Sequence, residues 1–251
     1  MQVGLIGAGN MARAMARGWG DPVLCSDSGS GRARALAQEL GGEAASNVEV
    51  AQRSDIVFLL HKPAQLDVVA SEIASSTKVV ASVLGGVSLA ELHAFYQGVP
   101  AFAVMPNTPV EVRRGVICLS TAPGVDEALK AQVISLLERL GTVVPIDEKL
   151  MPAATSVMGV GPAYLALVAE AQIDAAVRHG LSPALAGRLA AETMSGTASL
   201  LENRAYDTLT VRREVTSPGG STARGLEALE RDGVRTAFAD ATDAVINGGR
   251  R

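Results

Sequence analysis

The chain has 251 residues, which is enough for one large domain or two small ones. Apolar residues make up 48% and charged residues 19% of it, which excludes a disordered protein and allows a sizeable core. The formal net charge of −4 argues against a nucleic-acid partner, because such a partner favours a basic surface.

The first 147 residues alternate between short apolar runs and stretches with helical spacing. The spacing of Met11, Met15 and Trp19, for example, predicts a helix. Strands that are apolar on both faces are typical of a parallel sheet covered by helices, so we expect a Rossmann-type doubly wound α/β fold. The predicted strands are 1–9, 22–27, 55–62, 78–84, 100–106, 115–121 and 142–147, and the predicted helices are 10–20, 31–42 and 126–141.

The pattern changes after Asp147, and from Lys149 onward no segment predicts a strand. We therefore expect a dinucleotide-binding domain over 1–148 and an all-helical domain over 149–251. The Ala-rich faces of this second domain would pack either against a second copy of the chain or against the first domain. The predicted helices are 162–180, 182–203, 221–233 and 234–248, with Ser182 as N-cap and Pro183 in the first turn of the second.

Several features bear on the compartment. Cys25 and Cys118 stand in apolar, strand-like runs, so we expect two buried thiols and no disulfide. No signal-peptide pattern is present at the N-terminus. The uncharged stretch 151–169 contains two prolines and two glycines, which favours a buried helix over a membrane span. We expect a cytoplasmic protein with no membrane partner.

The first strand runs directly into Gly7-Ala8-Gly9-Asn10-Met11-Ala12, which has the G-x-G-x-x-G/A pattern of dinucleotide sites. Gly7 would permit the tight turn, Gly9 would let the backbone approach a pyrophosphate, and Ala12 would allow close helix–strand packing. The helix start then attracts the phosphates. The alternative is a plain strand–helix turn, and the position in the chain favours the dinucleotide.

The second strand ends at Asp27, surrounded by Ser26, Ser28, Ser30 and Arg32. An acid at this position would accept hydrogen bonds from a ribose 2′-hydroxyl and favour NAD, whereas the serines and the arginine could bind a 2′-phosphate. We expect NADP as the preferred cofactor, with Asp27 pointing away from the ribose, and NAD as the alternative.

Later strand ends should line the same crevice, because ligands bind outside the carboxyl ends of parallel strands. His61 could act as a proton donor, although a lone histidine at a strand end is more often structural. No cluster of residues has the spacing of metal ligands, so we expect no metal. The candidate cofactor contacts are Ile6, Gly7, Ala8, Gly9, Asn10, Met11, Ser26, Asp27, Ser28, Asn47, His61, Lys62, Pro63, Gly85, Asn107 and Thr108.

Near the end of the chain, a loop with Pro218, Gly219 and Gly220 interrupts a helical region and feeds a new helix start. An exposed helix N-terminus is a binding site for a small anion. The sequence therefore predicts an anion site in the second domain.

Together these motifs make the chain resemble the pyrroline-5-carboxylate reductase family. The matching pieces keep their order from residue 1 to about 245, and they are GLIGAGNMARAM, DIVFLLHKP, MPNTP, GPAY and SPGGSTARGLEALE. The resemblance implies a Rossmann domain followed by a helical domain that dimerises by interleaving helices, often in rings of dimers. It also implies an oxidoreductase of proline biosynthesis that uses NADPH or NADH to reduce the C=N bond of 1-pyrroline-5-carboxylate to L-proline.

The resemblance also assigns the anion site to the substrate. The backbone N–H groups of the loop would bind the substrate carboxylate, and Thr222 would donate toward the imine nitrogen as the catalytic residue. The implied substrate contacts are Gly219, Gly220, Ser221, Thr222 and Asn107.

The chain departs from the family pattern at several places. Met158 and Val160 stand where the family has serines, and 83–86, 202–210 and 212–214 also differ. These departures leave two alternatives open: a related reductase for a different cyclic imine or small oxo acid, and a non-catalytic dinucleotide-binding regulatory protein.

Overall fold

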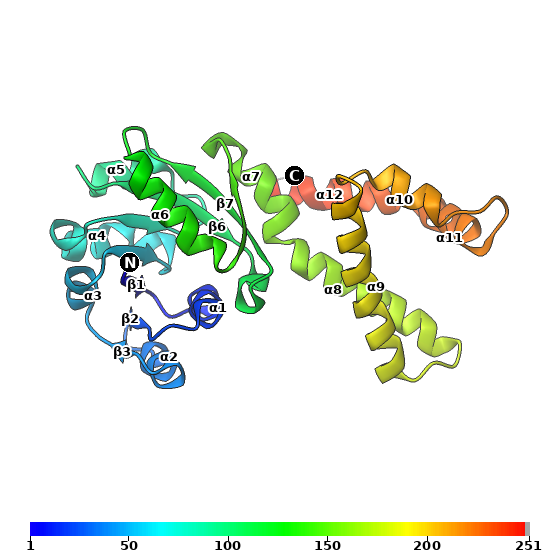
Figure 1. Ribbon diagram of the computed structural model, residues 1–251, viewed down its shortest axis with the longest axis horizontal. Coiled ribbons are helices and arrows are strands. Elements are labelled where there is room, and N and C mark those ends of the chain that lie inside the picture. The colour runs from blue at the N-terminus through cyan, green and yellow to red at the C-terminus, as the bar shows by residue number, and fades with distance from the viewer. Residues whose placement is uncertain (249–251) are drawn as a thin grey trace. The chain divides into compact units, whose positions relative to one another are not determined.

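The computed structural model describes residues 1–248 and divides the chain into two compact units (Figure 1). The first unit is Met1–Val160, and the second begins at Gly161. Residues 149–160 belong to the first unit, and the predicted domain limits 1–148 and 149–251 stay a prediction. This stretch contains α7 (Met151–Ala154) and a π-helical turn at Thr155–Gly159.

The first unit is built on an eight-stranded sheet made of β1 (Val3–Ile6), β2 (Leu24–Ser26), β3 (Glu43–Ala44), β4 (Ile56–Leu59), β5 (Val80–Ser82), β6 (Ala101–Pro106), β7 (Gly115–Thr121) and β8 (Gly141–Pro145). The strand order is β3-β2-β1-β4-β5-β6-β7-β8, and β1 to β6 are parallel. This confirms the doubly wound α/β fold. β7 departs from the expected parallel arrangement, because only a 3₁₀ turn at Thr108–Val112 joins it to β6 and a parallel connection needs a longer crossover.

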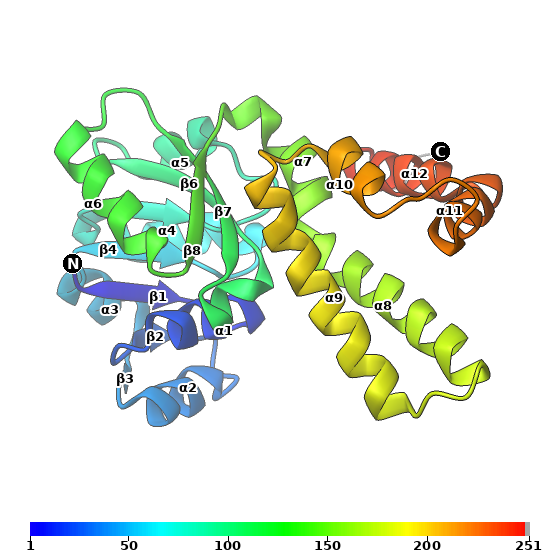
Figure 2. The ribbon, with the colours of Figure 1, turned by 45° about the vertical axis from the view of Figure 1, so that its right-hand side comes forward.

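Helices cover both faces of this sheet (Figures 1 and 2). One core packs under α1 (Asn10–Trp19), α2 (Arg32–Leu40) and α6 (Glu127–Glu138), the three helices that the sequence predicted. The other core packs under α3 (Asn47–Arg53), α4 (Leu66–Ile73) and α5 (Leu89–Phe95). These three span only seven or eight residues, too few for the apolar period to be recognised. Short 3₁₀ turns lie at Pro63–Gln65, Ala74–Ser76 and Glu148–Leu150.

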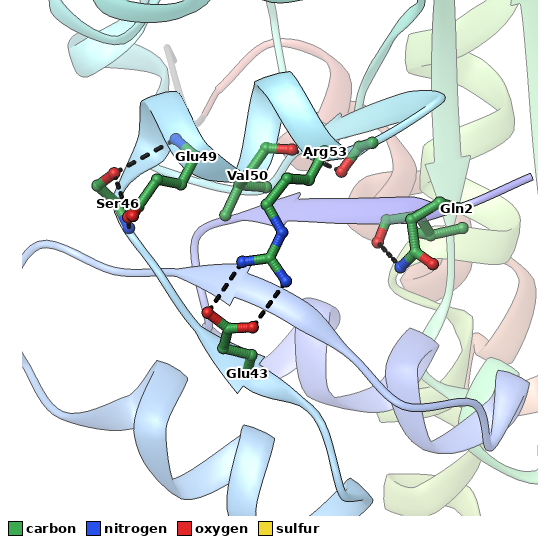
Figure 3. Close-up of polar contacts among 8 residues, drawn as sticks. Gln2, Glu43, Ser46, Glu49, Val50 and Arg53 are labelled. Atoms are coloured by element: carbon green, nitrogen blue, oxygen red, sulfur yellow. Dashed lines mark hydrogen bonds and ion pairs between the residues drawn. The ribbon is translucent and has the colours of Figure 1, made fainter.

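Figure 3 shows how α3 is fixed at both ends. At its start, Ser46 and Glu49 form a reciprocal capping box, an arrangement that contributes about 1 kcal/mol. At its end, Arg53 donates two hydrogen bonds to the Glu43 carboxylate, at 2.9 and 2.6 Å. The ion pair is half exposed and adds little stability, but the bidentate geometry sets the direction of the helix.

The second unit consists of helices and, within the described residues, contains no strand. Its helices are α8 (Gly161–Arg178), α9 (Pro183–Asn203), α10 (Thr208–Glu214), α11 (Ser221–Arg231) and α12 (Val234–Ile246). α8 and α9 lie side by side as a long pair (Figure 2). The Ser182 hydroxyl caps α9 as predicted, and α10 is an additional short helix.

The long helices of this unit expose apolar side chains. No residue of α8 is buried. Four leucines of α8 and α9 are about half exposed or more, namely Leu165, Leu167, Leu185 and Leu189. The helical run Glu148–Arg178 is long and apolar enough, by length and composition alone, to cross a membrane. Such a surface calls for a covering partner.

The core contains one unsatisfied polar atom that a conservative change can test. Tyr96 is fully buried, and its hydroxyl has no hydrogen-bond partner within residues 1–248. Burial raises the pKa of Tyr96, so the hydroxyl stays neutral. We expect Tyr96→Phe to raise the free energy of unfolding by about 1 kcal/mol in urea denaturation, because it removes a desolvated group at no cost in volume. Tyr96→Ala should lower it by about 3 kcal/mol or more; a loss of stability in the Phe variant would reveal a hidden partner for the hydroxyl.

Candidate functional site

The turn after β1 needs glycine at its first position. Gly7 has a φ of 107°, and a Cβ placed there would lie 2.6 Å from the carbonyl carbon of Leu60. Its N–H donates to the Ser26 carbonyl oxygen at 3.0 Å, which joins the turn to the end of β2. Gly7 is therefore required by the fold itself.

Gly9 is different, because nothing in the fold requires it. Its φ of −73° suits any residue, and a Cβ placed there meets no atom within 4 Å. α1 begins at the next residue without a side-chain cap and without an acid in its first turn. The missing side chain leaves open space directly before free backbone N–H groups, which is the arrangement that a phosphate group needs.

This open space is part of a cavity of about 550 Å³ at the carboxyl ends of β1, β2 and β4. The volume suits a small-molecule site. Of the predicted contacts, those that line it are Ile6, Gly7, Ala8, Gly9, Asp27, Ser28, Asn47, His61 and Lys62. The predicted contacts outside its lining are Asn10, Met11, Ser26, Pro63, Gly85, Asn107 and Thr108. Ser30 and Arg32, which the sequence suggested as possible phosphate ligands, also line the cavity, and the lining residues that the sequence did not suggest are Leu60, Gln65, Val68, Val69 and Glu72.

The Asp27 carboxylate is turned into its own loop. It accepts hydrogen bonds from the N–H of Gly29 at 2.9 Å, the hydroxyl of Ser30 at 2.7 Å and the N–H of Ala33 at 3.0 Å. Burial alone would raise the pKa of Asp27, but these hydrogen bonds lower it below its ordinary value. A charged carboxylate with three donors has little capacity left for a ribose hydroxyl.

Positive charge on the same cavity is unpaired. Arg32 and Lys62 both line the cavity and are exposed, and neither forms an ion pair within residues 1–248. Ser28 also lines the cavity, and it lies in the loop between Asp27 and the start of α2. These groups can bind phosphate oxygens.

His61 is held as a neutral ring. Its Nδ1 lies 2.9 Å from the Lys62 carbonyl oxygen, so this nitrogen must carry the proton and donate. Burial lowers the pKa of His61, and Nε2 is buried without a partner within the described residues. The ring therefore has no proton on Nε2 to give, which argues against the proton-donor role considered for it.

The amide of Asn107 is occupied inside the first unit. Its Nδ2 donates to the Met158 carbonyl oxygen at 3.0 Å, and its Oδ1 accepts from the Val116 N–H at 2.8 Å. The residue is 7% exposed. It ties the end of β6 to the π-helical turn, and its contact with cofactor or substrate stays a prediction.

In the second unit, the loop before α11 presents an uncapped helix start. Gly219 has a φ of 67°, and Gly220 is the N-cap, with its N–H bonded to the Ser217 carbonyl oxygen at 3.0 Å. By helix geometry the N–H groups of Ser221, Thr222 and Ala223 have no acceptor within the helix. No acid stands in the first turn.

Arg224 adds a cation to this helix start. Its Nη1 donates to the Gly219 carbonyl oxygen at 2.7 Å and thereby holds the glycine loop closed. A cation in the first turn opposes the helix dipole unless an anion binds there. The arrangement thus favours a bound carboxylate or phosphate.

Within residues 1–248, no three His, Cys, Asp or Glu side chains gather into a group that could hold a metal ion. The two sites offer backbone N–H groups, hydroxyls and cations, and the first also offers the carboxylates of Asp27 and Glu72.

Both halves of the chain match known families. Residues 148–251 match a family model described as pyrroline-5-carboxylate reductase dimerisation, and residues 2–86 match one described as NADP oxidoreductase coenzyme F420-dependent. A pyrroline-5-carboxylate reductase of Treponema pallidum is 33% identical over 98% of this chain and 99% of its own length. The chain belongs to the pyrroline-5-carboxylate reductase family.

Other members agree along the whole chain. The pyrroline-5-carboxylate reductase of Arabidopsis thaliana is 33% identical over 99% of this chain and 94% of its own length. Among solved structures, the Streptococcus pyogenes 1-pyrroline-5-carboxylate reductase superposes with a TM-score of 0.90, at 29% identity over 98% of this chain and 97% of its own. The Plasmodium falciparum pyrroline carboxylate reductase with NADP bound gives a TM-score of 0.88, at 28% identity over 99% of this chain and 97% of its own.

One departure from the pyrroline-5-carboxylate reductase pattern now has a structural reading. Met158 is 9% exposed, and its carbonyl oxygen is the acceptor for Asn107. Its side chain is thus largely buried in the first unit. Val160, the other position that carries a serine in the family, is only partly buried.

The contrast between the two glycines of the β1 turn gives a direct test. Gly9→Val should leave the melting temperature within about 2 °C of wild type, since a Cβ at this position meets no atom within 4 Å. It should weaken NADPH binding at least about 100-fold in calorimetry, because the side chain fills the phosphate position. Gly7→Ala is the matched control, and it should lower the melting temperature. Unchanged NADPH binding in Gly9→Val would refute the assignment of this turn.

Proposed function

We propose that this protein reduces the C=N bond of 1-pyrroline-5-carboxylate to give L-proline, with NADPH as the preferred reductant. The proposal is carried by full-length similarity to pyrroline-5-carboxylate reductases, together with two uncapped helix starts suited to two anions. NADPH, when bound, supplies the hydride that the imine carbon accepts.

The first unit supplies the cofactor site. The open space at Gly9 and the start of α1 receive the pyrophosphate. Ser28 and Arg32 bind the 2′-phosphate, while the three donors that hold Asp27 in its own loop reduce its repulsion of that group. This is the basis for preferring NADPH over NADH.

The second unit supplies the substrate site. The N–H groups of Ser221, Thr222 and Ala223 bind the substrate carboxylate, and Arg224 adds positive charge at the same helix start. The Thr222 hydroxyl donates a hydrogen bond to the imine nitrogen, which gains a proton as the carbon gains the hydride. The chain's own contribution is position and electric field.

The active form in this proposal is a homodimer assembled through the second unit. The dimerisation family model and the exposed leucines of α8 and α9 support it. Assembly of dimers into a larger ring and a cytoplasmic location are further expectations. No membrane is needed to explain the apolar run Glu148–Arg178, because a second copy of the chain would cover it.

A different cyclic imine is the second candidate substrate. Val160 and the charged stretch 212–214 favour it, since both differ from the family pattern near the expected substrate side. The buried position of Met158 weakens this alternative. A non-catalytic role is disfavoured by the uncapped start of α11, which a dinucleotide-binding regulatory protein has no need to keep, whereas the open phosphate space fits both roles.

The deciding experiment is a turnover assay. Loss of the reduced-nicotinamide absorbance is followed with pyrroline-5-carboxylate, using NADPH and NADH in separate reactions. We expect turnover with both and a higher kcat/KM with NADPH. Turnover of other cyclic imines, but not of pyrroline-5-carboxylate, would show that the substrate is a different imine. A clear preference for NADH would overturn the proposed role of Ser28 and Arg32 in binding the 2′-phosphate. Binding of NADPH without turnover of any imine would support the regulatory role.

Thr222→Ala tests the catalytic assignment. The variant should lower kcat roughly 100-fold, because it removes a donor that acts as the nitrogen is protonated. Thr222→Ser keeps the hydroxyl and should retain most of the activity. If Thr222→Ala turned over at the wild-type rate, Thr222 would be only a helix-start residue.

A further inference from the structure

One wall of the cavity is a single stripe along α4 and the turn before it. Four residues of this stripe line the cavity, and they lie three or four positions apart along the helix, which places them on one face. They are Gln65, Val68, Val69 and Glu72. Val68 is 56% exposed, although it is an apolar residue in a well-packed unit. The stripe therefore offers a flat apolar surface with a polar group at each end.

Glu72 is tied to the end of β2 through one residue. Asn47, the first residue of α3, donates from Nδ2 to Glu72 Oε2 at 2.7 Å, and its Oδ1 accepts from the Ser26 hydroxyl at 2.6 Å. The capping box at Ser46 fixes the helix start that carries Asn47. This network holds Glu72 in place before any ligand binds.

The second carboxylate oxygen of Glu72 is unused. Within residues 1–248, Oε1 has no hydrogen-bond donor and the side chain forms no ion pair. The residue is exposed and lines the cavity, so Oε1 is available to a donor on a ligand. An acceptor fixed at the end of an apolar strip is suited to a planar ring that carries an amino group.

The position along the cavity identifies which part of a dinucleotide lies there. β2 and β4 flank β1 in the sheet, so the loop after β2 and the start of α4 form opposite walls of one crevice. The loop after β2 contacts the ribose of the adenosine half in this fold. The adenine is attached to that ribose, and the Ser26–Asn47–Glu72 chain places Glu72 on the same side.

We infer that the α4 stripe is the purine-binding wall and that Glu72 selects adenine by accepting a hydrogen bond from its 6-amino group. The inference rests on the proposed NADPH dependence and deepens it. Val68 and Val69 provide the apolar surface for the base, and Asn47 positions the Glu72 carboxylate. Glu72 is thus a specificity residue that contacts the cofactor far from the reacting atoms.

The probe is the hypoxanthine counterpart of NADPH, in which a carbonyl oxygen replaces the 6-amino group. Dissociation constants for both reduced dinucleotides are measured on the full-length protein by calorimetry. Wild type should bind NADPH at least about 10-fold more tightly, since two acceptors would face each other in the analogue. In Glu72→Gln, whose amide can also donate, the ratio should fall to about 1.

Asp67→Asn is the matched control. It removes one negative charge from the same helix, but Asp67 does not line the cavity, so the ratio should stay at the wild-type value. This control shows whether a changed ratio in Glu72→Gln comes from a lost hydrogen bond to the base or only from the loss of one negative charge near a polyanionic ligand.

Four results would overturn the inference. Equal binding of the two dinucleotides by wild type would show that the protein does not distinguish the group at the 6-position of the purine. If the ratio of the two dissociation constants were unchanged in Glu72→Gln and NADPH-dependent turnover were normal, Glu72 would have no role in selecting the base. The proposed function would remain intact. If Glu72→Gln changed the ratio of the dissociation constants for NADPH and NADH, but not the ratio for NADPH and its hypoxanthine counterpart, the Glu72 contact would be with the ribose. Absence of NADPH binding in wild type would defeat both proposals together.

Discussion

The backbone N–H groups at the start of each helix need an acceptor, and this requirement organises both sites. Five helices meet it with their own side chains: Ser46 caps α3, Ser88 caps α5, Asp126 caps α6, Ser182 caps α9 and Asp207 caps α10. α1 and α11 instead begin after a glycine with no cap and no acid in the first turn. α2 and α12 also begin after a glycine that supplies no cap, and at α2 the Asp27 carboxylate accepts from the Ala33 N–H. α1 and α11 are the helix starts assigned to the cofactor and the substrate, where a bound anion would be the acceptor.

The cavity of the first unit is lined by charged side chains of both signs. Asp27 is satisfied by donors within its own loop, whereas Arg32 and Lys62 carry positive charge without an ion-pair partner in the described residues. Glu72 stands on the opposite wall with one oxygen unused. A ligand that is anionic in its middle and carries an amino donor at one end matches this pattern.

The doubly wound sheet, the glycine turn and the helix start at 221 could all be predicted from the sequence. Gly7 and Gly9 directly follow an apolar run, and the loop at 217–222 breaks a helical region, so both signals are local. The α4 wall could not be predicted, because Gln65 to Glu72 show too few turns for a periodic signal. We expected Asp27 to point away from the ribose, but the donors that hold it in its own loop, from Gly29, Ser30 and Ala33, depend on a loop geometry that the sequence does not show. Asn107 likewise looks like a free polar residue until β7 and the π-helical turn enclose its amide.

The absence of buried residues in α8 has a consequence for folding. The side chains of α8 are at most partly buried, in part against α9, so the helix gains limited tertiary stabilisation within its own chain, because burial of an apolar face supplies most helical stability in proteins. In the proposed homodimer a second chain would supply the rest, and folding of the second unit would then be a bimolecular reaction. The stability of this half of the molecule would rise with protein concentration, whereas the sheet domain, with its two internal cores, would unfold at a temperature independent of dilution.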